Sequence, residues 1–331
     1  MCKVGIPRGL LYYYYYPIWK TFFTKLGTQV IVSKETSKKT LNRGVAKTID
    51  EICLPVKIYN GHVAEIKDKV DYLFIPRIMS VENRQWICPK FQGLPEIVKS
   101  TFKKLPEIIS PVINYNDKKY STKKVVHEVG GIFTRDKKKI ENAFVAGLND
   151  YNHYQTLIKE YEMFPSDILS NNGNFDMNPY RYRKPKILVL GHPYLIYDNF
   201  ISMNLIKKLR EFGFNVITED NVTEKVTNNV LMKAKIDMYW TFGRKILGSV
   251  LHCIDANIIS GIVYVSSFTC GLDSVITEIL ERRVRRNSKI PYMLITIDEH
   301  TGEAGINTRL EAFTDMVKRG KNFENNVSSS R

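Results

Sequence analysis

Apolar runs and amphipathic segments follow one another in the same order at two places along the chain. Residues 3–6 predict a strand, residues 15–26 show the helical spacing of apolar positions, Gly27 is a helix stop, and residues 30–33 predict a second strand. The same order returns at 187–190, 200–212, Gly213 and 216–219. Because strands joined by a helix pair in parallel with right-handed crossovers, the pattern predicts an α/β protein with two Rossmann-like parallel-sheet domains.

Further apolar runs extend both predicted sheets. Strands are expected at 72–75 in the first domain and at 236–241, 262–266 and 293–297 in the second. A segment rich in Asn, Gly and Pro, 170–185, has the composition of a linker. The expected division is an N-terminal domain over 1–175, a C-terminal domain over 184–322 and a polar tail over 323–331.

Composition narrows the class of protein. The chain has 331 residues, of which 44% are hydrophobic and 25% charged, so it is a globular protein with material for about two domains. The longest near-unbroken apolar run, 10–19, is shorter than the ~18 residues that suggest a membrane span, so no membrane partner is expected. The N-terminus enters a strand directly, with no leader pattern, which favours a cytoplasmic protein.

Charge points toward anionic partners without identifying one. The net charge is +15, and an excess of this size favours nucleic acid, nucleotides or acidic proteins. Two local clusters, at 137–139 and 282–286, concentrate the basic residues. We interpret both as solvated faces in preference to a nucleic-acid patch, so nucleic acid is not the expected partner.

Three of the five cysteines lie between a predicted strand and the predicted helix that follows it. They are Cys53, Cys88 and Cys270, and the ligand edge of an open α/β sheet is where such turns gather. A thiolate before a helix start gains from free N–H groups and the helix dipole, as an anionic metal–sulfur site requires. The alternative is that each is a small buried hydrophobe. Cys253 has the helical spacing of a core residue, and Cys2 has no helix beside it.

Seven short phrases make the chain resemble a known family. They are GIPRGLLYY (5–13), DEICLPVK (50–57), IPR (75–77), CPKF (88–91), GHPY (191–194), CGLDS (270–274) and DEHTGEAG (298–305). The chain resembles the acyl-CoA dehydratase activase-related family, within the wider superfamily of 2-hydroxyacyl-CoA dehydratase and benzoyl-CoA reductase cluster subunits. The resemblance runs from Val4 to about Val317.

The resemblance implies an iron–sulfur protein. It implies a 4Fe-4S cluster between the two domains, held by Cys53, Cys88 and Cys270, with the fourth iron open to a small ligand or to the bridging sulfide of a double-cubane cluster. It implies anaerobic electron transfer at low potential, in a reductase or dehydratase component acting on an acyl-CoA or another small molecule. The alternative is a non-catalytic electron-transfer or cluster-carrying partner.

The expected partner is a separate activator ATPase. The chain has neither a GxxxxGK[ST] nor a GxGxxG element, so we do not expect it to bind ATP itself. A homodimer is one assembly open to it.

Titratable residues near the predicted strand ends are candidates for proton transfer. Glu299 and His300 follow the last predicted strand, and His192 follows the strand at 187–190, so these three are the candidate catalytic residues. The acids of 298–303 are alternatively helix caps, and Thr308 with Glu311 predicts a capping box.

Four further sequence features each have two possible roles. His62 is a site residue or a core histidine. Arg8 and Arg77, each beside a proline, are candidates to offset cluster charge or bind a CoA phosphate. The tyrosine run 12–16 is expected to pack a helix start in preference to lining an electron path.

Overall fold

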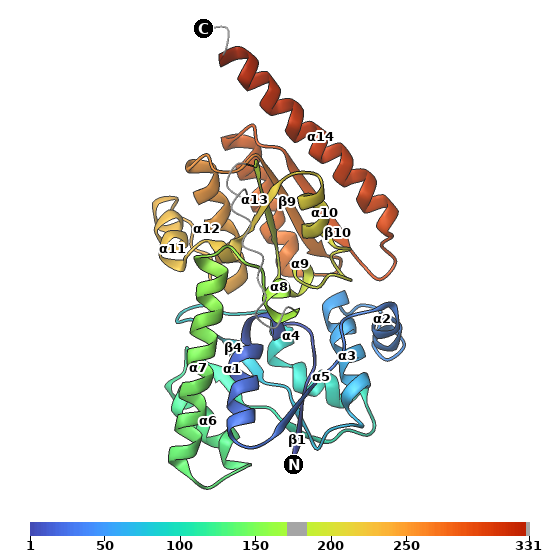
Figure 1. The fold of residues 1–331 in the computed structure, drawn as a ribbon, viewed down its shortest axis with the longest axis vertical. Helices are drawn as coiled ribbons and strands as arrows, with labels where there is room; N and C mark the ends of the chain where they lie inside the picture. The colour runs from blue at the N-terminus through green and yellow to red at the C-terminus, as the bar shows by residue number, and fades with distance from the viewer. Residues whose placement is uncertain (171–183, 329–331) are drawn as a thin grey trace. The chain divides into compact units, whose positions relative to one another are not determined.

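The computed structural model describes residues 1–170 and 184–328, which divide into two α/β units (Figure 1). The first unit comprises 1–172 with 238–244, and the second comprises 173–237 with 245–331. The expected linker at 170–185 lies, over 171–183, outside the described residues. Both units contain parallel sheets, so the predicted α/β class is confirmed.

A four-stranded parallel sheet organises the first unit. Its order is β2-β1-β3-β5, and its strands are β1 (Lys3–Ile6), β2 (Gln29–Val32), β3 (Tyr72–Phe74) and β5 (Glu107–Ile109). Two more strands, β4 (Arg77–Ser80) and β6 (Val112–Asn114), form a separate parallel pair. The helices are α1 (Tyr12–Lys25), α2 (Lys38–Val45), α3 (Leu54–Ile66), α4 (Pro89–Gln92), α5 (Leu94–Thr101), α6 (Thr122–Gly131), α7 (Lys137–Lys159) and α8 (Pro165–Ser170), with a 3-10 turn η1 (Lys118–Tyr120).

Helices α1 and α7 lie side by side in the first unit (Figure 1). Pro17 inside α1 has no N–H, so the carbonyl of Tyr13 lacks its usual helical donor. The hydroxyl of Tyr154 on α7 donates to that carbonyl at 2.5 Å. Gly147 allows close approach, because a Cβ there would lie 2.6 Å from the carbonyl oxygen of Ile18. The contact thus supplies the hydrogen bond that the proline removes.

Helices α2 and α3 approach each other through two glycines. A Cβ added to Gly44 would lie 1.9 Å from the carbonyl oxygen of Lys57, and one added to Gly61 would lie 2.1 Å from that of Thr40. Backbone therefore meets backbone at both positions, and no larger residue fits without moving a helix. This packing holds α3, which begins directly after Cys53.

A second four-stranded parallel sheet organises the second unit. Its order is β10-β9-β7-β8, and its strands are β7 (Lys186–Gly191), β8 (Asn215–Thr218), β9 (Gly261–Ser267) and β10 (Tyr292–Ile297). All residues of β8 and β9 are buried, as expected when helices cover a parallel sheet. The helices are α9 (Pro193–Ile196), α10 (Leu205–Glu211), α11 (Glu224–Lys233), α12 (Thr241–Asp255), α13 (Gly271–Asn287) and α14 (Glu303–Ser328), with a 3-10 turn η3 (Glu219–Asn221).

Two local predictions in the second half of the chain are wrong. No strand forms over 236–241. Its backbone instead makes an isolated bridge to Trp86 of the first unit, which receives a hydrogen bond from Thr241 and donates one to Tyr239. The capping box of Thr308 and Glu311 is also absent, because α14 begins at Glu303 and the Thr308 hydroxyl donates to the Ala304 carbonyl inside the helix.

The length of α14 follows from its apolar stripe. Ile306, Leu310, Phe313 and Val317 recur at helical spacing and are buried, so the helix starts before Thr308. It continues through the expected polar tail to Ser328, and residues 329–331 lie outside the described part. Among the described residues, no helix is both long and apolar enough to cross a membrane.

We expect Gly61→Ala to destabilise the first unit. The added methyl would meet the α2 backbone, and overpacking of this kind typically costs about 1–3 kcal/mol. Gly305→Ala is the matched control, because this glycine is exposed inside α14 with no atom near an added Cβ. It should stabilise by up to ~1 kcal/mol through helix propensity. Urea unfolding measures both, and equal effects would refute the proposed close contact.

Candidate functional site

The carboxyl edge of the second sheet gathers its chemically active residues. Strand β7 lies between β8 and β9, and the chain passes from β8 to the opposite side of β7 to form β9. The topological switch point therefore falls between β7 and β9, where open α/β sheets bind ligands. His192 follows β7 and Cys270 follows β9, so both stand at this switch point.

Three side chains converge there. His192 and Cys270 are the N-cap residues of α9 and α13, and Asp273 lies in the first turn of α13. Their ligand atoms all lie within 4.8 Å of one another, and His192 Nε2 is 3.1 Å from Asp273 Oδ1. His192 and Asp273 are both buried, whereas Cys270 is partly exposed. An imidazole, a thiol and a carboxylate at this spacing can bind a metal ion or share protons.

The electrostatics of the cluster favour a charged pair. Burial lowers the pKa of His192, but the Asp273 carboxylate, with a further hydrogen bond to Cys270, reverses this effect and raises the pKa well above 6.5. Burial raises the pKa of Asp273, and the charge of His192 lowers it below its usual range. The two pKa shifts agree, because each favours the charged form. We therefore assign His192 as a protonated imidazole and Asp273 as a carboxylate.

Neighbouring aromatic residues orient this pair. The hydroxyl of Tyr264, on β9, donates to Asp273 Oδ1 at 2.8 Å. The ring of Tyr194 stacks on that of His192, with centroids 5.1 Å apart and planes 18° apart. Both contacts fix the imidazole against the sheet edge beside Cys270.

A second buried polar cluster follows β8 at the same edge. Asp220 pairs with Lys245 and accepts a hydrogen bond from the Tyr197 hydroxyl at 2.5 Å. Glu219 is also buried, and its pKa is raised well above 4.5 by burial and by the neighbouring Asp220 charge. Glu219 therefore holds its proton more tightly than an exposed glutamate does, and it lies beside an ion pair. No sequence motif predicted this cluster, although two adjacent acids after an apolar strand were a usable signal.

The first unit places its two candidate cysteines in the same local setting. Cys53 is the N-cap residue of α3 and Cys88 is the N-cap residue of α4, and both thiols are partly exposed. Pro55 and Pro89 follow within the first helical positions, where a missing N–H costs nothing. Helix α3 leads into β3, so its N-terminus lies toward the carboxyl end of that parallel strand.

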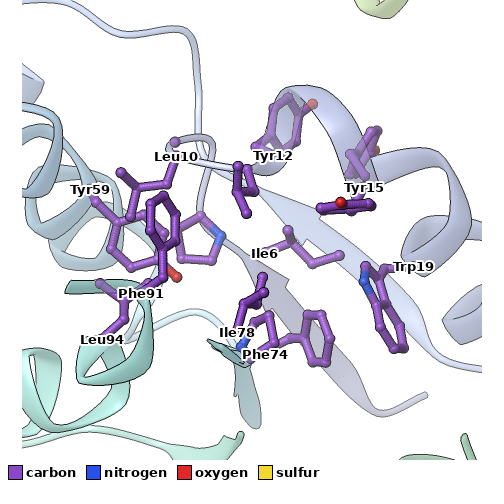
Figure 2. A pocket seen from close by; sticks show the side chains of 15 residues that line it. Ile6, Leu10, Tyr12, Tyr15, Trp19, Tyr59, Phe74, Ile78, Phe91 and Leu94 are labelled. Carbon is purple, nitrogen blue, oxygen red and sulfur yellow. The ribbon is translucent and has the colours of Figure 1, made fainter. Parts of the chain in front are cut away.

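An apolar pocket lies between these helices and α1. Its volume is about 60 Å³, and it is lined entirely by residues of the first unit. Figure 2 shows Tyr59 of α3 and Phe91 of α4 on one side, with Tyr15 and Trp19 of α1 on the other. Part of the tyrosine run thus packs the helix start, as expected, and part lines this pocket.

Both candidate arginines have protein partners. Arg8 lies 3.3 Å from Glu35 and over the ring of Tyr12, at 5.6 Å from its centroid. Arg77 pairs with Glu96 and donates to the Gln92 carbonyl at 2.5 Å. Arg77 therefore ties β4 to the helices that follow Cys88.

The remaining histidine and acid candidates lie in different settings. His62 is buried in α3, 3.0 Å from the Thr36 hydroxyl, and burial lowers its pKa to about 3, so it is a neutral core histidine. His300 is exposed and Glu299 partly exposed after β10. Asp298 accepts hydrogen bonds from the His300 N–H and the Thr301 hydroxyl, which closes this turn. Among the described residues, the cluster of His192, Cys270 and Asp273 includes neither His300 nor Glu299.

Fold and site together define a class: a two-unit parallel α/β protein with cysteines at helix N-caps. Comparison with family models then identifies the family. Residues 3–222 match the CoA enzyme activase uncharacterised domain, and residues 141–317 match the D-component of 2-hydroxyglutaryl-CoA dehydratase. Each match covers more than half of the chain, so the chain belongs to this dehydratase-like family with its activase association. No curated protein matches the sequence.

We expect Asp273→Asn to remove most of the pH dependence that His192 gives to stability. His192 has a raised pKa, so its contribution is full below pH 6.5 and is lost as the pH rises through the folded-state value. Breaking a buried pair typically costs about 3–5 kcal/mol, so the variant should be least stable, relative to the parent, at about pH 6. Urea unfolding of the metal-free protein across this range measures the difference.

Tyr264→Phe is the control for this experiment. It removes a hydrogen bond to Asp273 but leaves the charged pair, so it should cost about 1 kcal/mol without changing the pH slope. Parallel pH profiles for the parent and Asp273→Asn would contradict the assignment of a charged His192.

Proposed function

We propose that this protein is the iron–sulfur component of a low-potential reductase or dehydratase system that acts on an acyl-CoA or another small molecule. The observation that carries the proposal is that Cys53, Cys88 and Cys270 are each the N-cap residue of a helix. Free N–H groups at a helix start stabilise thiolates, and thiolates are the ligands of iron–sulfur clusters. Membership of the dehydratase D-component family supports the same role.

The chemistry of the five cysteines fits this ligand set. Burial raises the pKa of the Cys253 thiol to about 12, and burial with Asp71 raises that of Cys2. Both thiols are thus disfavoured as thiolates, and neither lies at a helix start, whereas Cys53, Cys88 and Cys270 are helix N-cap residues. Under this proposal, Cys53 and Cys88 of the first unit and Cys270 of the second would hold a 4Fe-4S cluster.

Residues around Cys270 have a defined part in the proposal. A bound cluster would supply one-electron chemistry at low potential. His192 would donate a hydrogen bond toward the Cys270 sulfur, and Asp273 would hold the imidazole in its donating orientation. Glu299 and His300 remain candidates for moving protons to a substrate, since they stand on the adjoining strand end.

The number of suitable thiols favours a reactive cluster over a simple carrier. Carrier clusters use four cysteine ligands, and this chain offers three at helix N-caps. The open iron would bind a small ligand or the sulfide of a second cubane. Turnover of an acyl-CoA or a small reducible molecule would support this reading, and cluster reduction without turnover would support an electron-transfer partner.

Activase association in the matched family supports a separate activator ATPase. Such a partner would supply low-potential electrons in the cytoplasm, and the net charge of +15 would favour an acidic docking face.

Single replacement of Cys53, Cys88 or Cys270 by Ala should remove most of the bound iron. Cys2→Ala and Cys253→Ala are the controls and should retain it. Iron and acid-labile sulfide are measured on anaerobically purified protein, together with its electron paramagnetic resonance spectrum. Full iron retention in Cys270→Ala would overturn a cluster with ligands from both units.

The activator hypothesis predicts ATP-dependent reduction. With its activator, ATP and a strong reductant, the protein should be reduced faster than with reductant alone, as followed by visible absorption. The gain should shrink as salt rises, because exposed charges are screened. A non-hydrolysable ATP analogue is the control. ATP hydrolysis by the isolated chain would contradict the assignment of ATPase activity to a partner.

A further inference from the structure

A basic groove lies in the first unit, between helices α2 and α3 and the segment that follows α5. Helices α2 and α3 pack side by side, and α5 also contacts α3 (Figure 1). The groove, which we call the α2–α5 groove, has a volume of about 1100 Å³. Typical small-molecule pockets span roughly 300–1,000 Å³, so this groove has room for a larger ligand.

One face of α2 lines the groove, and it carries three cations. The lining residues there are Lys39, Asn42, Arg43, Ala46 and Lys47, whose spacing of three and four residues puts them on one side of the helix. Four more cations come from the segments that end two other helices. Lys67 and Lys69 follow α3, and Lys103 and Lys104 follow α5.

The positive charge of the α2–α5 groove is not balanced by acids. Its acidic lining residue is Glu65. Among the described residues, Lys67 is the one lining cation with an ion-pair partner, Asp68, at 2.7 Å. Cations that lie close together without counter-ions repel one another, and an anionic ligand would relieve that repulsion.

The basic cluster at 282–286 differs from the groove in this respect. Arg282 and Arg285 pair with Glu278 and Glu281, one turn earlier on α13. Charges of that cluster are therefore partly neutralised within one helix. The cations of the α2–α5 groove are instead brought together by the fold from separate segments, and they are left unbalanced.

The groove lacks the backbone features of a phosphate site. Phosphates typically bind free N–H groups at a helix start or in a glycine-rich loop. Helices α3 and α5 contribute their C-terminal ends to the lining, where the helix dipole is negative, and the described lining contains no glycine. The start of α2 is closed by a capping box, in which the Ser37 hydroxyl accepts from the Thr40 N–H.

The groove is also unsuited to nucleic acid. Single strands stack their bases on exposed aromatic rings, but the aromatic lining residue, Phe102, is only 7% exposed. Duplexes are read by helices or strands that protrude into their grooves, whereas this site is hollow. Carboxylates on flexible side chains need neither feature, because they pair with lysine ammonium groups without a fixed geometry.

We propose that the α2–α5 groove binds a carboxylate-rich segment of a partner protein. The unpaired lysines supply the complementary charge, and complementary charge speeds association and fixes the orientation of the partner. The groove contains no cysteine, so this inference does not rest on the iron–sulfur proposal.

The test measures binding of a fluorescein-labelled decaglutamate peptide to the full chain by fluorescence anisotropy. We expect saturable binding of one equivalent. Affinity should fall at least tenfold as salt rises from about 0.02 to about 0.2 M, because exposed charges are screened. Absence of saturable binding would overturn the proposal. Tighter binding of a thymidine decanucleotide or of tripolyphosphate would also overturn it, because the groove would then be a phosphate site.

A matched pair of double variants locates the peptide. Lys39→Glu with Lys104→Glu reverses two exposed cations of the groove. Lys137→Glu with Lys138→Glu is the control, because it gives the same net charge by reversing two exposed lysines outside the groove. The groove variant should weaken peptide binding at least tenfold, and the control by less than threefold. Equal weakening would show that net charge alone attracts the peptide and would overturn the assignment.

A second groove variant keeps the test decisive if the first does not fold. Lys69→Gln with Lys103→Gln neutralises two exposed lysines that lie outside the helices, so α2, α3 and α5 keep their own residues. It should weaken peptide binding at least threefold, and an unchanged affinity would refute the role of the groove. Because no readout uses iron, failure here would leave the iron–sulfur proposal untouched.

Discussion

Parallel strand pairing is the constraint on which the rest of this structure depends. Parallel neighbours cannot be joined by a tight hairpin, so each connection crosses back over the sheet, usually as a helix. All strands of a sheet then end at one edge, and the turns that follow them share a small volume. In the second unit this brings together His192, Cys270 and Glu219, which are far apart in sequence.

The two units repeat a topology but not a chemistry. Each has its first strand flanked by the second strand on one side and a later strand on the other. In the first unit, the pocket beside Ile6 and Pro7, after β1, is apolar, and Arg8 is paired with Glu35. The carboxyl edge of the second sheet buries the side chains of Asp273 and Asp220, each in an ion pair. Buried charges need partners, and the His192 and Lys245 cations supply them.

Sequence patterns predicted β7, β9 and β10 well because these strands are apolar over most of their length. They missed β4, β5 and β6, short strands in which few apolar residues follow one another. The helix-start positions of the three cysteines were predicted from local sequence order, but Cys53 follows α2 and not the predicted strand. Asp273 was missed because an acid in a first helical turn is typical of capping, and only the fold brings it to His192.

The isolated β-bridge of Trp86 limits where the chain can be cut into separately folding fragments. Its partners lie in 238–244, a segment that belongs to the first unit although the chain has by then entered the second. The ring of Phe242 also lies against that of Tyr14, with centroids 6.1 Å apart. A fragment ending at residue 172 would therefore lack residues 238–244, which belong to the first unit. A fragment starting at residue 173 would carry residues 238–244 without the Trp86 and Tyr14 contacts that they make in the full chain.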